Sequence, residues 1–262
     1  MKTVFFEKIQ TRSIFITGTD TGVGKTIVTG LLARFFFEKG LKVITQKWIQ
    51  TGNANDVNMH LKLMRMPGSI VKKYLPYIMP YKFKFPASPH FASKLEKIKI
   101  SKQKIIKNFH ILQETFDYVL VEGIGGAFVP YNNKELVIDI VKELKLPAII
   151  VVGNKLGAIN HTLLTIEALR NRKIKILGLI FNNIDKKADK TILEDNIKII
   201  KKLTKAKVLG ALPYAKRTHN TQGSFFNTAF LAAEGWHDFE GFRRPQCDMK
   251  GNISSLRANL CP

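Results

Sequence analysis

A glycine-rich run near the N-terminus constrains this chain more than any other feature. Residues 18–26 read Gly-Thr-Asp-Thr-Gly-Val-Gly-Lys-Thr, after the apolar segment 14–16 and before a helix-like segment that starts near Thr26. A strand, a glycine-rich turn and Lys-Thr at a helix start form a cradle for nucleotide phosphates, because backbone N–H groups and the positive end of the helix face the anion. In such a loop Lys25 reaches the outer phosphates and the Thr26 hydroxyl binds Mg²⁺.

The spacing of this loop departs from the common pattern. Four residues usually separate the first glycine from Gly-Lys-Thr, whereas here Thr19 holds that place and Gly18 lies one residue earlier. The Gly-Lys-Thr ending is intact, with a strand before it and a helix after it. The sequence therefore favours a variant phosphate loop over an ordinary glycine turn.

Length and composition favour a single globular domain. The chain has 262 residues, 45% of them hydrophobic, which suits one α/β domain with a full core. It contains no run of eighteen apolar residues, and the apolar part of residues 1–7 is too short for a signal peptide. Cys247 and Cys261 belong to no nucleophile or zinc motif. We expect a cytoplasmic protein without a membrane partner.

The formal net charge of +22 raises the question of nucleic-acid binding. The lysines are scattered through nearly every segment, and no aromatic ladder or compact arginine patch accompanies them. We therefore expect no nucleic-acid partner, and we interpret the charges as solvated faces that also steer anionic ATP.

Hydrophobic patterning predicts strands that alternate with helices. After the first strand, we expect strands at 43–47, 118–121, 148–152, 176–181 and 208–210, helices up to Gly40 and over 53–66, 93–112, 136–144, 159–170 and a lysine-rich segment ending at Leu203, and an irregular excursion over 74–89. This alternation predicts a P-loop NTPase-type parallel sheet with helices on both faces. Ligands of such sheets bind at the carboxyl ends of the strands, where we expect Gly18, Lys47, Glu122, Gly153 and Asn182.

Two acidic residues are candidate metal ligands beside Thr26. Mg²⁺ prefers hard oxygen ligands, usually one or two carboxylates together with phosphates and water. Glu122 ends a buried apolar strand, where an unpaired carboxylate is costly unless a metal or a cation offsets the cost. Asp56 is the second candidate, and the alternative for both is a helix-capping or loop-solvated acid. Lys47 ends a strand and is either a second cation for the phosphates or a surface residue.

Two glycine-containing turns add binding capacity. Gly125-Gly126 leaves room for a ligand to approach the backbone closely, although such a pair is often just a turn. Residues 157–161, Gly-Ala-Ile-Asn-His, begin a helix after a strand, so their N–H groups offer either a second anion site or a simple helix start. We interpret His161 as structural rather than as a general base.

Taken together, six stretches resemble the dethiobiotin synthase family, the ATP-dependent ligases that form the ureido ring in biotin biosynthesis. They are residues 17–26, 47–52, 88–90, 121–126, 155–161 and 181–183. The resemblance implies a homodimer that acts on 7,8-diaminononanoate, CO₂ and MgATP. One amine takes up CO₂ as a carbamate, whose oxygen attacks the γ-phosphate. The second amine then closes the ring, and phosphate leaves.

Matching positions imply the roles of single residues. The resemblance implies that Thr26, Asp56 and Glu122 hold Mg²⁺, and that the catalytic set is Lys25, Lys47 and Thr21, the two lysines stabilising charge on the transferring phosphoryl group. It further implies nucleotide contacts by Gly22, Val23, Gly24, Lys25, Thr26, Glu122, Gly125, Asn182 and Pro213, with Asn182 reading adenine. The implied substrate contacts are Thr21, Lys47, Thr51 and, for the distal carboxylate across the dimer interface, Gly157, Ala158, Ile159 and Asn160. Positioning and charge neutralisation supply the rate, so no side-chain nucleophile is expected.

The chain departs from the family at two places. Trp48 stands where the family usually has proline after the lysine, which affects how Lys47 is presented. Residues 221–262 have four basic and four acidic side chains and no periodicity, so the whole net charge lies upstream. We divide the chain into a dethiobiotin-synthase-like domain over 1–220 and an atypical, disordered or non-native tail over 221–262.

Two other functions fit parts of the sequence. A partition-type ATPase would share the fold class and bind DNA through its basic surface, but that group has an extra lysine near the start of the phosphate loop and lacks the element at 157–160. A glutamine-dependent amide synthase of the corrin pathway has a similar loop, but it needs a glutaminase domain for which this chain is too short. Carboxylation with ring closure is the function that the sequence favours.

Overall fold

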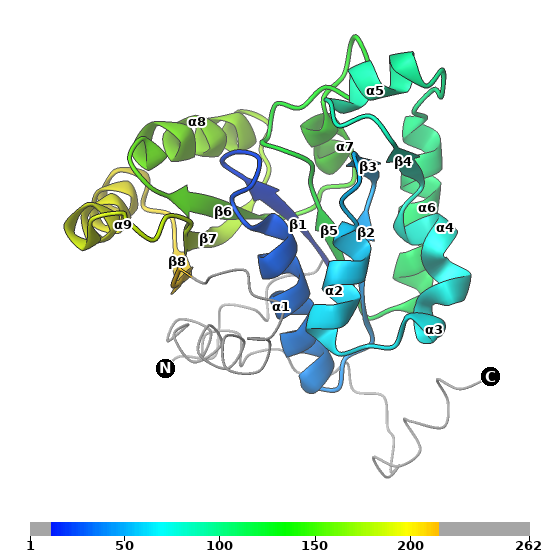
Figure 1. Ribbon diagram of the computed structural model, residues 1–262, viewed down its shortest axis with the longest axis horizontal. Coiled ribbons are helices and arrows are strands. Elements are labelled where there is room, and N and C mark those ends of the chain that lie inside the picture. The colour runs from blue at the N-terminus through cyan, green and yellow to red at the C-terminus, as the bar shows by residue number, and fades with distance from the viewer. Residues whose placement is uncertain (1–11, 215–262) are drawn as a thin grey trace.

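The computed structural model of this protein describes residues 12–214, whose centre is a six-stranded sheet (Figure 1). All neighbouring strands are parallel, in the order β2-β5-β1-β6-β7-β8. The strands are β1 (Ser13–Gly18), β2 (Val43–Lys47), β5 (Tyr118–Glu122), β6 (Ala148–Asn154), β7 (Ile176–Asn183) and β8 (Val208–Leu212). Central strands of such a sheet are buried on both faces, which explains their continuous apolar sequences.

Helices cover both faces of the sheet, as the sequence predicts (Figure 1). On one face, α1 (Lys25–Glu38) and α2 (Asp56–Met64) pack on alternate strand residues such as Ile14, Leu120 and Val151. On the other face, the intervening strand residues, among them Val119 and Ile150, contact the remaining long helices. These are α6 (Lys102–Thr115), α7 (Val137–Glu143), α8 (Ala158–Asn171) and α9 (Lys190–Thr204).

The region between α2 and α6 differs from the sequence expectations in its helices. The helix expected over 53–66 ends before Pro67, but the short helical segments that follow were not predicted: α3 (Gly68–Val71), a 3₁₀ turn (Lys72–Tyr74) and α4 (Leu75–Ile78). The predicted helix over 93–112 is two helices, α5 (Pro89–Leu95) and α6. Lys97, with φ of 55°, breaks the first, and the Ser101 side chain caps the second by accepting from the Lys104 N–H.

The predicted irregular excursion over 74–89 contains a strand. β4 (Tyr81–Phe83) pairs in parallel with β3 (Ile49–Thr51), which the sequence analysis also missed. Tyr81 and Phe83 are buried while Lys82 between them is exposed, the period of two typical of a strand. The flanking prolines, Pro80 and Pro86, had masked this short alternation. The small sheet fixes Thr51 at the end of β3.

Two predictions concern parts of the chain beyond this description. The tail over 221–262, and with it the domain boundary near 220, lies outside the described residues. Within residues 12–214, no helix is both long enough and apolar enough to cross a membrane.

Candidate functional site

The predicted phosphate loop connects β1 to α1 at the carboxyl edge of the sheet. Gly22 and Gly24 have φ of 75° and 96°, in the left-handed region that favours glycine. A Cβ at Gly24 would also collide with the side-chain amide of Asn182, whose Nδ2 donates to the Val23 carbonyl at 2.9 Å. The loop therefore needs glycine at this place, and Asn182, the predicted adenine reader at the end of β7, lies directly against it.

The start of α1 is open to an anion. The helix begins at Lys25 with no side-chain cap and no acidic residue in its first turn, so its first N–H groups keep their capacity to bind phosphate. The Lys25 Nζ donates to the Asp20 carbonyl of the same loop at 2.8 Å. The pKa of Lys25 is lowered to about 8, mainly by burial and to a smaller extent by repulsion from the Lys47 cation. Within residues 12–214 this buried cation is hydrogen-bonded only to a neutral carbonyl, which an anionic ligand can replace.

Glu122 is the centre of a buried group of polar side chains at the ends of β2 and β5. Lys47 and Glu122 are register partners in the sheet, and the Lys47 Nζ lies 2.8 Å from Glu122 Oε1. The same ammonium contacts Asp56 Oδ2 at 2.9 Å and the Gly123 carbonyl at 2.9 Å. The Thr26 hydroxyl donates to Glu122 Oε1 at 3.0 Å. Four residues that the sequence analysis selected separately are thus linked to one another through Glu122 and Lys47.

His60 is a further member of this group, and the sequence analysis missed it. Its ring is fully buried on α2, and Nε2 lies 2.7 Å from Glu122 Oε2. The spacing from Asp56 to His60 is i, i+4, which places both residues on one helix face and is the signal that would have identified it. We call the set Thr26, Lys47, Asp56, His60 and Glu122 the charged cluster.

The charged cluster keeps Glu122 ionised. Burial by itself raises the pKa of this carboxyl, but Lys47 and the hydrogen bond from His60 outweigh burial and lower the pKa to about 2. The alternative of a loop-solvated acid is therefore wrong for Glu122, which is 2% exposed. Asp56 is not a helix cap either, because Asn55 caps α2 and Asp56 pairs with Lys47.

The oxygen atoms of the charged cluster fit a magnesium ion. Thr26, Asp56 and Glu122 contribute a hydroxyl and two carboxylates, the hard donors that Mg²⁺ shares with phosphate and water. The two carboxylates, of Asp56 and Glu122, already contact one cation, the Lys47 ammonium. No group of three His, Cys, Asp or Glu side chains between residues 12 and 214 is arranged to hold a metal alone, so a nucleotide would have to supply the remaining ligands.

The other predicted residues occupy neighbouring loops of the same edge. The turn after β5 lies against the phosphate loop, since a Cβ at Gly125 would lie 3.5 Å from Thr21 Oγ1. The start of α8, with Gly157 as its N-cap at φ of 87°, follows β6, whose Gly153 N–H donates to Thr19 Oγ1 at 3.3 Å. Ala158, Ile159 and Asn160 form the first turn of that helix. Pro213 directly follows β8 at the far end of the sheet.

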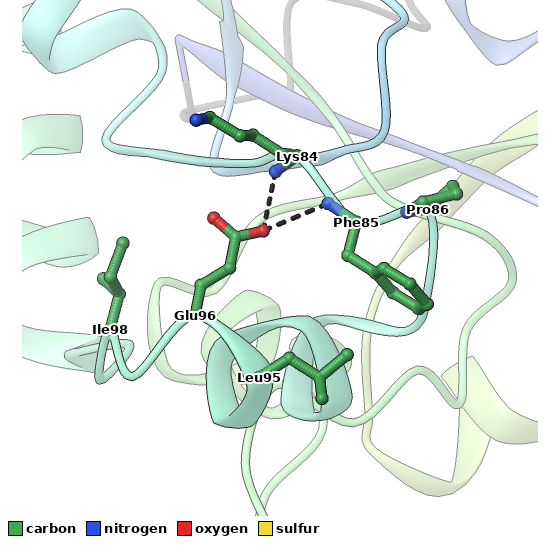
Figure 2. A pocket seen from close by; sticks show the side chains of 6 residues that line it. All are labelled: Lys84, Phe85, Pro86, Leu95, Glu96 and Ile98. Atoms are coloured by element: carbon green, nitrogen blue, oxygen red, sulfur yellow. Dashed lines mark hydrogen bonds between the residues drawn. The ribbon is translucent and has the colours of Figure 1, made fainter.

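A separate pocket contains none of the predicted site residues. It has a volume of about 510 Å³ and lies between the end of β4 and α5 (Figure 2). Figure 2 shows Glu96 accepting hydrogen bonds from the backbone N–H groups of Lys84 and Phe85, at 2.7 and 3.0 Å. These bonds tie the segment after β4 to the end of α5.

Comparison with known proteins decides the family. A family profile described as an AAA domain matches residues 12–222. The ATP-dependent dethiobiotin synthetase BioD of Thermodesulfovibrio yellowstonii is 42% identical over 213 residues, which cover 76% of this chain and 88% of the relative. The protein of the same name from Halalkalibacterium halodurans is 39% identical and is covered to 87% of its length. The chain belongs to the dethiobiotin synthetase family. The predicted family and its class, an ATP-dependent ligase of biotin biosynthesis, are confirmed.

Solved structures of more distant proteins have the same fold as this member of the dethiobiotin synthetase family. The cell division protein MinD of Aquifex aeolicus aligns with a TM-score of 0.55 over 90% of this chain and 99% of its own, at 19% identity. A ParA family ATPase from Chlorobium tepidum aligns with a TM-score of 0.51 at 14% identity. These likenesses confirm the P-loop NTPase-type fold alone. They do not favour the partition-type alternative, because the relatives matched in sequence are dethiobiotin synthetases.

Trp48 shows how this member of the dethiobiotin synthetase family accommodates its departure from proline. The indole is buried, stacks on Phe15 with ring centroids 5.8 Å apart, and donates from Nε1 to Gln46 Oε1 at 2.8 Å. Gln46 in turn donates to the Tyr77 carbonyl at 3.0 Å. The large Trp48 side chain therefore packs in the hydrophobic core, and the Lys47 side chain still contacts Glu122.

Proposed function

We propose that this protein converts 7,8-diaminononanoate, CO₂ and ATP into dethiobiotin, ADP and phosphate. The observation that carries the proposal is the contact of the open phosphate loop with the charged cluster, in a chain 42% identical to a dethiobiotin synthetase. Loop and cluster together supply what phosphoryl transfer to a carbamate requires, namely anion binding and concentrated positive charge.

The chemistry needs three successive attacks. A substrate amine adds to CO₂ and loses a proton, which gives a carbamate. A carbamate oxygen attacks the γ-phosphorus, and ADP leaves. The second amine attacks the carbamoyl carbon of the resulting mixed anhydride, and inorganic phosphate leaves as the ring closes. Each attack joins groups that the protein only has to hold together, so no covalent enzyme intermediate is needed.

We assign the protein's part in these steps to the residues at the edge of the sheet. Lys25 and Lys47 neutralise charge on the transferring phosphoryl group, and Thr21 and Thr51 contact the diamine or carbamate end. Thr26, Asp56 and Glu122 would hold Mg²⁺, which would supply neutralising charge to the phosphates. Gly22, Val23, Gly24, Gly125, Asn182 and Pro213 contact the nucleotide. Residues 157–160 receive the substrate carboxylate.

The proposal extends to assembly and location. We infer a homodimer, in which residues 157–160 act across the interface, and a cytoplasmic location without a nucleic-acid partner. Sedimentation of the purified chain would test the dimer. Gel shifts on DNA across a salt series would test for a nucleic-acid partner, since salt-sensitive binding would favour a DNA-linked function.

A single assay tests the reaction. The purified full chain is incubated with diaminononanoate, bicarbonate and MgATP, and dethiobiotin and phosphate are measured together. We expect one phosphate released for each dethiobiotin formed, with no product when the diamine is left out. A folded sample that forms no dethiobiotin, or that hydrolyses ATP equally well without diamine, would contradict the proposal.

A further inference from the structure

His60 is the unexpected member of the charged cluster, and its hydrogen bond is made to Glu122, a predicted metal ligand. The ring has no exposed surface, and its Nδ1 has no hydrogen-bond partner among the described residues. Its Nε2 lies 2.7 Å from Glu122 Oε2. A buried histidine with a single hydrogen bond, made to a predicted metal ligand, calls for an explanation.

The contacts define the direction of this hydrogen bond. Glu122 is ionised and a carboxylate can only accept hydrogen bonds, so His60 Nε2 is the donor and Glu122 Oε2 the acceptor. Within the described residues Nδ1 makes no hydrogen bond, so the bond to Glu122 is the one polar contact that orients the ring.

The two oxygens of Glu122 have separate partners. Oε2 accepts from His60, whereas Oε1 faces Thr26 and Lys47. A carboxylate with only Oε1 tethered could rotate about its terminal torsion, which is soft. The bond from His60 stops this rotation and leaves Oε1 directed at the Thr26 hydroxyl.

The helix that carries His60 is itself held at a fixed place. α2 packs against α1, and a Cβ at Gly30 would lie 2.5 Å from the Leu63 Cδ1 atom. The two helices therefore approach closely at a glycine, one turn after the Lys25-Thr26 helix start. This packing couples the position of the imidazole to the phosphate loop.

We propose that His60 is a positioning residue that orients the Glu122 carboxylate for the metal–nucleotide complex. The proposal rests on the proposed function, because it takes Glu122 as a magnesium ligand. Groups that hydrogen-bond to metal-ligating side chains typically contribute about 10–100-fold to metal affinity. We expect a loss of that size when the donor is removed.

Three substitutions separate the hydrogen bond from the shape of the side chain. In His60→Gln the amide Nε2 keeps a donor at the reach of the imidazole Nε2. In His60→Asn the amide is one methylene shorter and cannot reach Glu122, although its polarity is the same. In His60→Leu the donor is removed and an apolar side chain fills the space. The Gln and Asn pair decides the question even if the Leu variant does not fold.

Binding of Mn²⁺ to the full chain, followed by electron paramagnetic resonance with a non-hydrolysable ATP analogue present, is the direct readout. We expect affinity to fall about 10–100-fold in His60→Asn and His60→Leu and to be largely retained in His60→Gln. Affinity for the nucleotide without metal should stay the same in all variants. In turnover assays the KM for Mg²⁺ should rise while kcat at saturating Mg²⁺ changes little.

Two results would overturn the proposal. One is unchanged Mn²⁺ affinity in a folded His60→Asn variant. The other is equal loss in the Gln and Asn variants, which would mean that ring shape matters rather than the hydrogen bond. If instead wild type binds Mn²⁺ as expected but forms no dethiobiotin, the proposed reaction fails and the role of His60 stands.

Discussion

Two groups of buried and half-buried polar side chains lie at the carboxyl edge of the sheet, and their polar atoms are satisfied in different ways. The charged cluster, between β1, β2 and β5, combines a lysine with two carboxylates. The second group, which we call the amide cluster, joins β6, β7 and α9 through Asn154, Asn183 and Asn196. Asn154 donates to Asn183 Oδ1 at 3.0 Å, and Asn196 donates to Asn154 Oδ1 at 3.0 Å.

This difference indicates which of the two clusters takes part in the reaction. Neutral amides satisfy one another in a fixed arrangement, and nothing is gained by separating them. In the charged cluster the ammonium of Lys47 is shared by two carboxylates, and an incoming cation and an incoming phosphate can each take over one side of that pairing. We infer that the amide cluster is a scaffold and that the charged cluster is where charge is redistributed.

We expect the largest effect from a substitution that removes the centre of the charged cluster. Glu122→Ala should lower kcat by on the order of a hundredfold or more, the typical loss when one electrostatic contact to a phosphoryl or oxyanion group is removed. Single-turnover phosphate release measures the effect, and Lys25→Ala should lose a similar factor. Near-normal rates in both folded variants would contradict the assignment of Glu122 and Lys25 to the active site.

A medium effect is expected in the amide cluster. Asn196→Leu leaves the buried Asn154 Oδ1 without its donor, so the free energy of unfolding should fall by about 1–3 kcal/mol. Urea denaturation measures the change, and Lys198→Leu, at an exposed position of the same helix, is the control, expected within about 0.5 kcal/mol of wild type. If Asn196→Leu impaired Mn²⁺ binding as strongly as His60→Asn, the two clusters would not be functionally distinct.

The smallest effect is a pH dependence that arises from Lys25. Its pKa in the folded protein is about 8, below the ordinary value of 10.5, so the cation that binds phosphate is lost as pH rises through 8. We expect kcat/KM for ATP to fall above about pH 8 by up to about tenfold per pH unit. A nearby phosphate favours the cation, so kcat itself should fall only at higher pH.

Two controls accompany this profile. Lys25→Arg keeps its charge at all accessible pH values, so its kcat/KM should not fall between pH 8 and 10, whatever its absolute rate. The unfolded chain binds the Lys25 proton up to pH 10.5 and the folded chain only up to about 8, so this group makes stability rise with pH between those values. A wild-type kcat/KM that stays level to pH 10 would contradict the lowered pKa.

Most of the sheet and much of the site could be predicted from the sequence. The bounds of β2 are those expected, because a short apolar segment between a helix-ending glycine and a lysine leaves little choice. Glu122 ends β5, and Lys25 and Thr26 begin the helix that follows the loop after β1, so the order of strands brings the three residues together. Parallel topology alone therefore specifies this part of the site.

Other features depended on packing that no local pattern reveals. β3 and β4 are three residues each and form a strand pair only because residues thirty-two positions apart meet. The i, i+4 spacing from Asp56 places His60 on the same helix face, but its hydrogen bond to Glu122 follows only from the placement of α2 in the fold. The carboxylates of Asp56 and Glu122 were expected around a metal, whereas the pairing of both with Lys47 emerged from the structure.

The central claim is that Thr26, Asp56 and Glu122 together hold a divalent ion against a nucleotide. Anomalous diffraction from crystals grown with Mn²⁺ and a non-hydrolysable ATP analogue tests it most directly. We predict one strong peak between these three side chains and the β- and γ-phosphates, at oxygen distances near the roughly 2.1 Å typical of such small hard cations. A peak bound by phosphates alone, with Glu122 still paired to Lys47, would contradict the claim.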